Sequence, residues 1–338
     1  MADQDQRPAV ELRRLVNGYQ VSQCIYVAAA LGIADLLADG PRSSDELAAA
    51  ADADPRSLHR LLRALAAVGV LCEEDDRRFA LTELGEAIRS DAPEGIAGWA
   101  AFVGRPSHWQ AWGDLLHSVR TGENAFRHVH GTDVWSYRAE RPEESEVFDR
   151  AMMTLTRRSN RALVEAYDFR RFGTIVDVGG GNGALLALLL ARYPALKGVL
   201  FDQPHVVAGA GEVLGAAGVA ERCRVVSGSF FDGIPPGGDA YLLKAIIHDW
   251  EDAESRAILR ECRAVVPDAG ALLVIDRVLG PPNTDPAAKL SDLNMLVAAG
   301  GCERTLEEFE SLFAEAGFRL VGATPTAAGL SVIEGAPD

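Results

Sequence analysis

The stretch TIVDVGGGNG, residues 174–183, constrains the fold more than any other part of the sequence. An apolar run that contains one acidic residue, Asp177, is followed by four glycines within five positions and then by the helical run ALLALLLARY. This order predicts a buried strand, a tight loop and the start of a helix. Glycines allow positive φ angles and a close approach of the backbone to a ligand, and a helix N-terminus presents free N–H groups. We therefore expect a nucleotide-like cofactor at this loop.

The loop alone leaves two cofactors open. Gly179, Gly181 and Ala184 fit the G-x-G-x-x-G/A pattern of dinucleotide sites. Asp177 stands two residues before the first glycine, where its carboxylate can accept a hydrogen bond from an ammonium group. S-adenosylmethionine carries such a group, whereas a pyrophosphate would be repelled there.

Strand-like and helix-like runs alternate from residue 174 onward, which predicts an α/β domain with a parallel sheet. The expected strands are 174–178, 198–202, 224–227, 240–244 and 271–277. A late helix should begin at Thr305, in a capping box with Glu308, and a hairpin of 318–323 and 330–334 should close the sheet. We place the domain boundary between residues 170 and 171.

The preceding 170 residues are mainly helical. The pattern of residues 11–37 is helical, and few charges lie between Val16 and Ala34, which favours packing inside a large core or against a second subunit; we expect a homodimer. Ser43 with Glu46, and then Asp54 before a proline, predict two capped helices, and the runs VLCEE and RFALT predict the hairpin of a winged helix. Residues 43–89 contain ten acidic residues and six arginines, whereas DNA-binding modules are basic. We therefore interpret the winged helix as a dimerisation or lid element.

Composition and charge exclude several classes of protein. The net charge of −16 argues against nucleic acid and anionic membranes as partners. No run approaches the roughly 20 apolar residues of a membrane helix, and the polar start MADQDQR does not resemble a signal peptide, so we expect a cytoplasmic protein. The five cysteines show no C-x-x-C spacing, and the pair His128 and His130 has no third ligand at metal-site spacing. We therefore expect no metal site.

Polar residues follow the predicted strands, at the edge where ligands bind in such sheets. Asp202 ends the second strand and is placed to bridge two ribose hydroxyls. Asp232 follows the third strand and could accept from an adenine amino group, while a neighbouring phenylalanine packs on the ring. Lys244 ends the fourth strand.

His248 follows the fourth strand closely and is the most informative single residue. Its unperturbed pKa suits a general base near neutral pH. Asp276, at the end of the fifth strand, and Glu303, before the late helix, are carboxylates that could fix its tautomer.

Five motifs now carry a family resemblance. In order and spacing, VDVGGGNG, FDQPHVV, SGSFFD, LLKAIIHDW and GGCERTLEEF resemble the S-adenosylmethionine-dependent small-molecule O-methyltransferases, which include plant caffeate and isoflavone enzymes and bacterial antibiotic-tailoring enzymes. The resemblance spans nearly the whole chain. It implies a Rossmann-like class I methyltransferase domain at 171–338, behind a mainly helical, winged-helix dimerisation domain at 1–170. It also decides the cofactor in favour of S-adenosylmethionine.

The resemblance assigns roles to individual residues. Asp177, Gly179 and Gly181 would hold the methionine end of the donor, and Asp202 would hold its ribose. The remaining donor contacts would come from Asp232, Phe231 and Lys244. His248 matches the catalytic base, with Asp276 and Glu303 as its flanking acids; many plant relatives have glutamate at the position of Asp276.

The expected reaction is metal-independent methylation of a hydroxyl on an aromatic or polyketide-type small molecule in secondary metabolism. Aromatic and methionine side chains suit a flat apolar acceptor. The predicted acceptor contacts are Trp99, Phe102, Met153, Asp249, Trp250, Asn294 and Met295. Two alternatives remain: a tailoring hydroxylase or decarboxylase that uses the donor structurally, and a winged-helix regulator that senses a small molecule.

Overall fold

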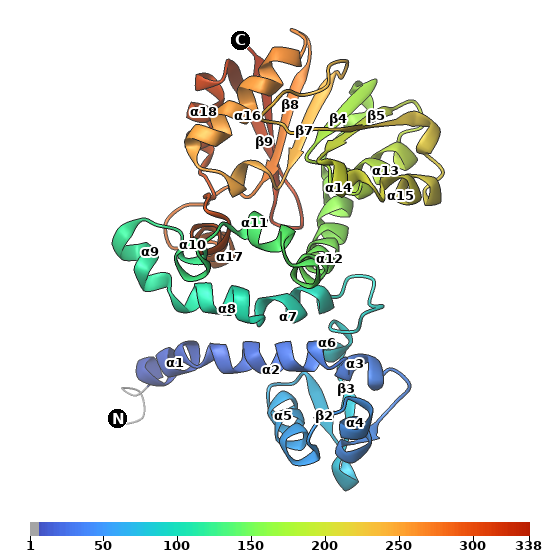
Figure 1. The fold of residues 1–338 in the computed structure, drawn as a ribbon, viewed down its shortest axis with the longest axis vertical. Helices are drawn as coiled ribbons and strands as arrows, with labels where there is room; N and C mark the ends of the chain where they lie inside the picture. Colours follow the sequence, from blue (N-terminus) through green and yellow to red (C-terminus); the bar gives the residue numbers. More distant parts are fainter. Residues whose placement is uncertain (1–6) are drawn as a thin grey trace. The chain divides into compact units, whose positions relative to one another are not determined.

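The computed structural model describes Arg7 to Asp338, which form two compact units (Figure 1). The first unit contains the described residues up to Gly113 together with Thr132–Arg157. The second contains Asp114–Gly131 and Arg158–Asp338, so a short segment from the first half of the chain belongs to the second unit.

A seven-stranded sheet forms the centre of the second unit (Figure 1). Its strands are β4 (Thr174–Val178), β5 (Lys197–Asp202), β6 (Cys223–Ser227), β7 (Ala240–Lys244), β8 (Ala271–Asp276), β9 (Phe318–Pro325) and β10 (Ser331–Pro337). The spatial order is β6-β5-β4-β7-β8-β10-β9. The first five strands in that order are parallel, and β10 runs antiparallel to both β8 and β9.

This sheet confirms the predicted α/β fold class and strand pattern. The bounds of β4 and β7 are those predicted, and β5, β6 and β8 differ by one residue at one end. The closing hairpin exists, but its strands are longer than predicted because the pairing of β9 with β10 continues to Pro337.

Helices cover both faces of the sheet, and each face has its own core. On one face, α13 (Ala184–Arg192) and α15 (Ala210–Ala216) pack with Ile175 of β4, Leu200 of β5 and Leu242 of β7. On the other, α16 (Asp252–Val265) and α18 (Leu306–Glu315) bury their apolar faces against β7 and β8. The predicted capping box of Thr305 and Glu308 starts α18. The shorter elements of this unit are α9 (Leu115–Thr121), α10 (Ala125–His130), η2 (Phe169–Arg171), α14 (Pro204–Val207), η3 (Ala220–Arg222), η4 (Ile247–Asp249), α17 (Pro286–Asn294) and the π-helical η5 (Met295–Ala299).

The first unit contains the predicted winged helix. Helices α4 (Ser44–Ala50) and α5 (Pro55–Ala67) begin at the predicted caps, because Ser43 accepts from the Glu46 N–H and Asp54 from the Ser57 N–H. The wing is a three-stranded sheet. Its elements and flanking helices are α1 (Arg7–Val16), α2 (Gly18–Ala30), α3 (Ile33–Leu36), β1 (Arg42–Ser43), β2 (Leu71–Glu73), η1 (Asp75–Arg77), β3 (Arg78–Leu81) and α6 (Glu83–Glu86).

The rest of the first unit is helical. It comprises α7 (Ala97–Val103), α8 (Pro106–Gly113), α11 (Val134–Ala139) and the first part of α12 (Pro142–Ala166). Phe102, Val147 and Ala151 form a small core among these helices. Across Arg7–Asp338, none of the helices combines the length and the apolar character that crossing a membrane requires.

Candidate active site

The polar strand ends of the second unit lie along one edge of its sheet. Because β5, β4, β7 and β8 are parallel neighbours, their carboxyl ends lie side by side. Asp202, Lys244 and Asp276 are the last residues of β5, β7 and β8, and Asp177 is the penultimate residue of β4. The fold therefore places four of the predicted site residues at adjacent positions, where ligands bind in such sheets.

The glycine loop after β4 has the backbone that its sequence requires. Gly179 has a φ of +69°, and a Cβ added to it would lie 2.5 Å from Cδ1 of Ile246, so only glycine fits without strain. The N–H of Gly181 donates to Oδ2 of Asp202 at 2.8 Å. This bond ties the loop to the end of β5 and orients the Asp202 carboxylate, which keeps further lone pairs for a ligand hydroxyl.

Asp177 is a buried carboxyl group that is only partly satisfied. Its side chain is 2% exposed, and within the described chain Oδ2 has no hydrogen-bond partner. Burial raises the pKa of Asp177 to about 7, although the positive charge of Lys244 opposes the shift. A buried acceptor without a donor is costly, and an ammonium group of a ligand would satisfy it. This observation fits the expected donor.

Lys244 complements the carboxylates on its two sides. Burial lowers the pKa of its ammonium group to about 8, and the carboxylates of Asp177 and Asp276 oppose that shift. Lys244 and these two carboxylates therefore influence each other's pKa values, and a charged ligand bound beside them would change those values.

An aromatic cluster follows β6. The ring of Phe231 meets that of Trp250 edge to face at 4.9 Å, and Phe230 packs against both. Phe231 is 40% exposed, which leaves ring surface free for a flat ligand. Asp232 is exposed in the adjoining turn, where its N–H donates to the carbonyl of Ser229 at 3.0 Å.

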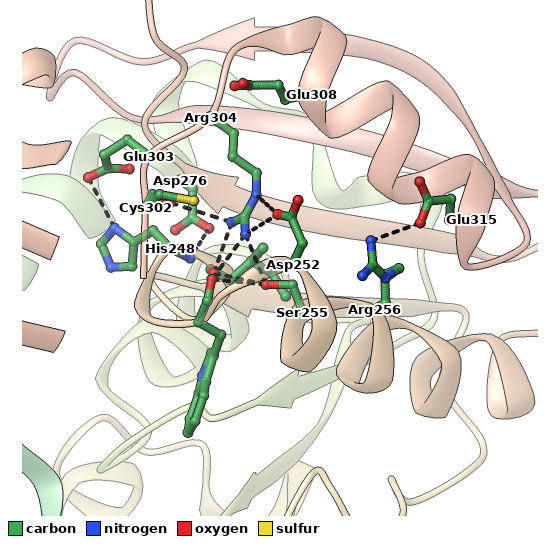
Figure 2. A network of polar contacts seen from close by, with 12 residues as sticks. His248, Asp252, Ser255, Arg256, Asp276, Cys302, Glu303, Arg304, Glu308 and Glu315 are labelled. Atoms are coloured by element: carbon green, nitrogen blue, oxygen red, sulfur yellow. Dashed lines mark hydrogen bonds and ion pairs between the residues drawn. The ribbon is translucent and has the colours of Figure 1, made fainter. Parts of the chain in front are cut away.

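His248 lies in η4, and the two acids predicted beside it contact it differently (Figure 2). Its Nδ1 is 3.2 Å from Oε1 of Glu303. Asp276 instead accepts from the backbone N–H of His248, at 3.3 Å from Oδ2. Glu303 thus orients the ring while Asp276 holds the backbone. On the other side of the ring, Nε2 lies 3.7 Å from Oδ1 of Asp249.

The surrounding carboxylates determine the titration of His248. Burial by itself would lower the pKa of the imidazole, but the negative charges of Asp276, Asp249 and Glu303 outweigh it and raise the pKa to about 10. Burial also raises the pKa of the Asp276 carboxyl to about 7. The cluster therefore holds a proton tightly at neutral pH, and its charge depends on what binds beside it.

Two residues next to Glu303 were not expected from the sequence. The hydroxyl of Ser291, on α17, donates to Oε1 of Glu303 at 2.7 Å, and Oδ1 of Asp292 accepts from the Glu303 N–H at 3.0 Å. Ser291 thus holds the carboxylate of Glu303, whose side chain is fully buried, and Asp292 holds the Glu303 backbone. No local pattern marks Ser291 or Asp292, because their contacts depend on how α17 packs against the segment before α18.

The predicted acceptor contacts are divided between the two units. In the second unit, Asp249 and Trp250 adjoin His248, Asn294 ends α17, and Met295 begins η5 and is 9% exposed. A π-helical segment such as η5 is common at functional sites. The other three lie in the first unit: Phe102 in its small core beside Trp99, and Met153 with half of its surface exposed. Contact of these residues with an acceptor stays a prediction.

Comparison with known proteins gives consistent matches over most of the chain. Residues 112–319 match the model of an O-methyltransferase domain, and residues 13–90 match that of an O-methyltransferase dimerisation domain. A phenazine O-methyltransferase of Lysobacter antibioticus is 44% identical over 96% of this chain and 95% of its own length. The O-demethylpuromycin-O-methyltransferase of Streptomyces alboniger is 45% identical over 96% of this chain and 88% of its own.

A solved structure is similar as well. An O-methyltransferase from neocarzinostatin biosynthesis, in complex with S-adenosylmethionine and 2-hydroxy-5-methyl naphthoic acid, superposes with a TM-score of 0.83 at 36% identity. The match covers 94% of this chain and 96% of that one.

Proposed function

The chain belongs to the S-adenosylmethionine-dependent O-methyltransferases that carry a dimerisation domain, and on that premise we propose how its residues perform the reaction. The enzyme uses S-adenosylmethionine to methylate an aromatic small molecule of secondary metabolism. We propose that the methylated group is a ring hydroxyl and that His248 is the general base that removes its proton.

The observation that carries this proposal is the pairing of His248 with Glu303. With Oε1 of Glu303 at 3.2 Å, the neutral imidazole keeps its proton on Nδ1, and the lone pair of Nε2 is free to accept the proton of an acceptor hydroxyl. A phenol ionises near pH 10, so proton removal is a substantial part of the barrier. Glu303 also stabilises the imidazolium that forms.

The donor is held, in this proposal, by the residues at the strand ends. Asp177 accepts from its ammonium group, Gly179 and Gly181 provide room and backbone contacts, and Asp202 takes the ribose hydroxyls. Asp232 and Phe231 bind the adenine, and Lys244 completes the site. When bound, S-adenosylmethionine supplies an electrophilic methyl group to the acceptor oxygen.

Donor binding also prepares the base for catalysis. At a pKa of about 10 the imidazole of His248 is protonated at neutral pH in the donor-free protein. The pKa of His248 would be lowered by the positive charge of a bound donor, which would favour the neutral imidazole. His248 would then be neutral, and able to act as a base, only in the donor complex.

We further propose that two copies associate through the first unit and that no metal takes part in methyl transfer. The dimerisation-domain match covers residues 13–90. Helix α1 leaves Val10, Leu12, Leu15 and Val16 between 54% and 64% exposed, and a second subunit would cover them.

Labelled methyl transfer to matched acceptors tests the proposal. Hydroxynaphthoates and phenolic acids, each paired with its amino and methoxy analogues, are incubated with methyl-labelled donor in the presence of a metal chelator. We expect label on oxygen of the hydroxy compounds. Label confined to the amines, or turnover that requires an added metal, would overturn it.

A further inference from the structure

Four side chains of the α9–α10 segment form a cluster that the methyl-transfer site does not use. Nδ1 of His128 lies 2.6 Å from Oδ2 of Asp114, and Nε2 of His117 lies 2.9 Å from Oε2 of Glu123. The two imidazole rings stack with centroids 3.7 Å apart and planes within 8°. The pair His128 and His130 is therefore not the relevant one, because His130 packs on Phe126 instead.

The ligand atoms of this cluster are close enough to share one ion. One atom from each of Asp114, His117 and His128 can be chosen so that all lie within 4.8 Å of one another. Metal–ligand bonds of about 2.0–2.2 Å place the ligands of a tetrahedral site somewhat over 3 Å apart. The required movement is small, and Asp114 and His128 are 33% and 52% exposed, which leaves them room to rotate.

We propose that Asp114, His117 and His128 bind a divalent transition-metal ion. Two imidazoles with a carboxylate suit Zn²⁺, whereas Mg²⁺ and Ca²⁺ prefer ligand sets made of oxygen alone. The ion also ties α9 to α10, whose N-cap residue Asn124 donates to the carbonyl of Leu296 in η5 at 2.7 Å.

Zinc titration of the full-length, tag-free protein tests this site independently of catalysis. After treatment with a chelator, the wild type should take up one equivalent of Zn²⁺, measured by calorimetry and by competition with a chromophoric chelator. The His117→Gln/His128→Gln variant keeps donors for Asp114 and Glu123 and should lose that equivalent. His130→Gln is the matched control and should retain it. No bound zinc in the wild type, or equal uptake by the double variant, would overturn the proposal.

Arg304 is 2% exposed and lies next to Glu303 (Figure 2). Its guanidinium donates to the carbonyls of Ile247 at 3.2 Å and Trp250 at 3.0 Å, on the two sides of His248. It also donates to Oδ1 of Asp252 at 2.8 Å, at the start of α16. One side chain thus satisfies backbone acceptors of the turn that carries the base.

The backbone on the other side of Glu303 packs directly on the same turn. A Cβ added to Gly301 would lie 2.3 Å from the carbonyl oxygen of His248 and 2.4 Å from the backbone nitrogen of Trp250. Such a contact is possible only because residue 301 has no side chain. Gly301 and Arg304, which precede and follow Glu303 in the chain, therefore both contact the η4 turn and hold it against this segment.

We infer that Arg304 and Gly301 are positioning residues that hold Glu303 against the ring of His248. This inference rests on the proposed role of His248 as the base. Lysine at position 304 keeps the charge but cannot bond to three acceptors in fixed directions. In Arg304→Lys the separation of His248 from Glu303 should therefore increase.

NMR titration and a double-mutant cycle test the positioning role of Arg304. Arg304→Lys should lower the pKa of His248, leave donor affinity unchanged and reduce kcat by about tenfold or more. In a Glu303→Gln background the same substitution should reduce kcat much less, because the pairing that it supports is already lost. Arg256→Lys is the control, because Arg256 is also on this side of the unit but pairs with Glu315 (Figure 2). An unchanged pKa of His248, or equal losses of kcat in the two backgrounds, would overturn this positioning role. The pKa measurement tests the contact with Glu303 whether or not His248 acts as the base.

Discussion

Nδ1 of His248 lies 3.2 Å from Oε1 of a glutamate 55 residues later in the chain, Glu303. The carboxylate is fully buried, and Oε1 also accepts from Ser291 at 2.7 Å. The orientation of the imidazole is therefore determined by a carboxylate that is itself held in place. This arrangement leaves Nε2 as the ring nitrogen that can exchange a proton with a ligand.

The Glu303→Gln variant should change both the rate and its pH dependence. Nearby negative charge raises the pKa of His248, so the imidazole becomes a base only as pH rises through that pKa. Removing one charge lowers the pKa, and the rising limb of kcat against pH should move to lower pH. Maximal kcat should fall by roughly tenfold or more because the imidazolium loses its partner. A limb that stays in place or moves to higher pH would contradict this account.

The charge of the bound donor should be visible in the titration of His248. Sinefungin carries a positive amine where S-adenosylhomocysteine has a neutral thioether. The pKa of His248, followed by NMR, should be lower in the sinefungin complex because of the added positive charge. Equal pKa values of His248 in the two complexes would show that the charge of the donor does not affect the base, which would contradict the proposed coupling.

Asp177→Asn should weaken donor binding without affecting the base. A charge-assisted hydrogen bond to the donor ammonium would be lost, which corresponds to roughly 10- to 100-fold in Kd. In the wild type, donor affinity should rise between about pH 6 and pH 7.5, because the pKa of Asp177 is about 7 and only its ionised form pairs with an ammonium group. Calorimetry with S-adenosylhomocysteine measures both effects. Equal affinity of the variant would show that Asp177 does not contact the donor.

Leu12→Glu/Leu15→Glu should dissociate the proposed homodimer. Both leucines are about 60% exposed on α1, and two buried carboxylates would be costly in a subunit interface. Light scattering should report a dimer for the wild type and a monomer for the variant. Val321→Glu, a similar change at an exposed apolar residue of β9, should leave the dimer intact. A monomeric wild type, or a variant that remains dimeric, would contradict the proposal.

The sequence predicted those parts of the fold and site that depend on local patterns. The strand, glycine loop and helix around Asp177 follow from neighbouring residues, and the parallel-sheet rule brings Asp177, Asp202, Lys244 and Asp276 to one edge. These predictions needed no tertiary detail.

Other features depend on packing between distant segments. Ser291 reaches Glu303 only because α17 packs beside it, and Arg304 bonds to carbonyls more than fifty residues earlier. Asp276 was expected beside the ring of His248, but its Oδ2 accepts from the backbone N–H. The cluster at His128 was missed because its partners Asp114 and His117 match no metal-binding spacing.

The most direct test of the account is the turnover of His248→Gln, measured together with its donor affinity. Glutamine can still donate to Glu303 but cannot accept a proton from a phenol. We predict that kcat falls by roughly 10²-fold or more while the Kd of S-adenosylhomocysteine is unchanged. Turnover within about twofold of the wild type, measured at saturating acceptor where the chemical step limits the rate, would show that methyl transfer proceeds without this base.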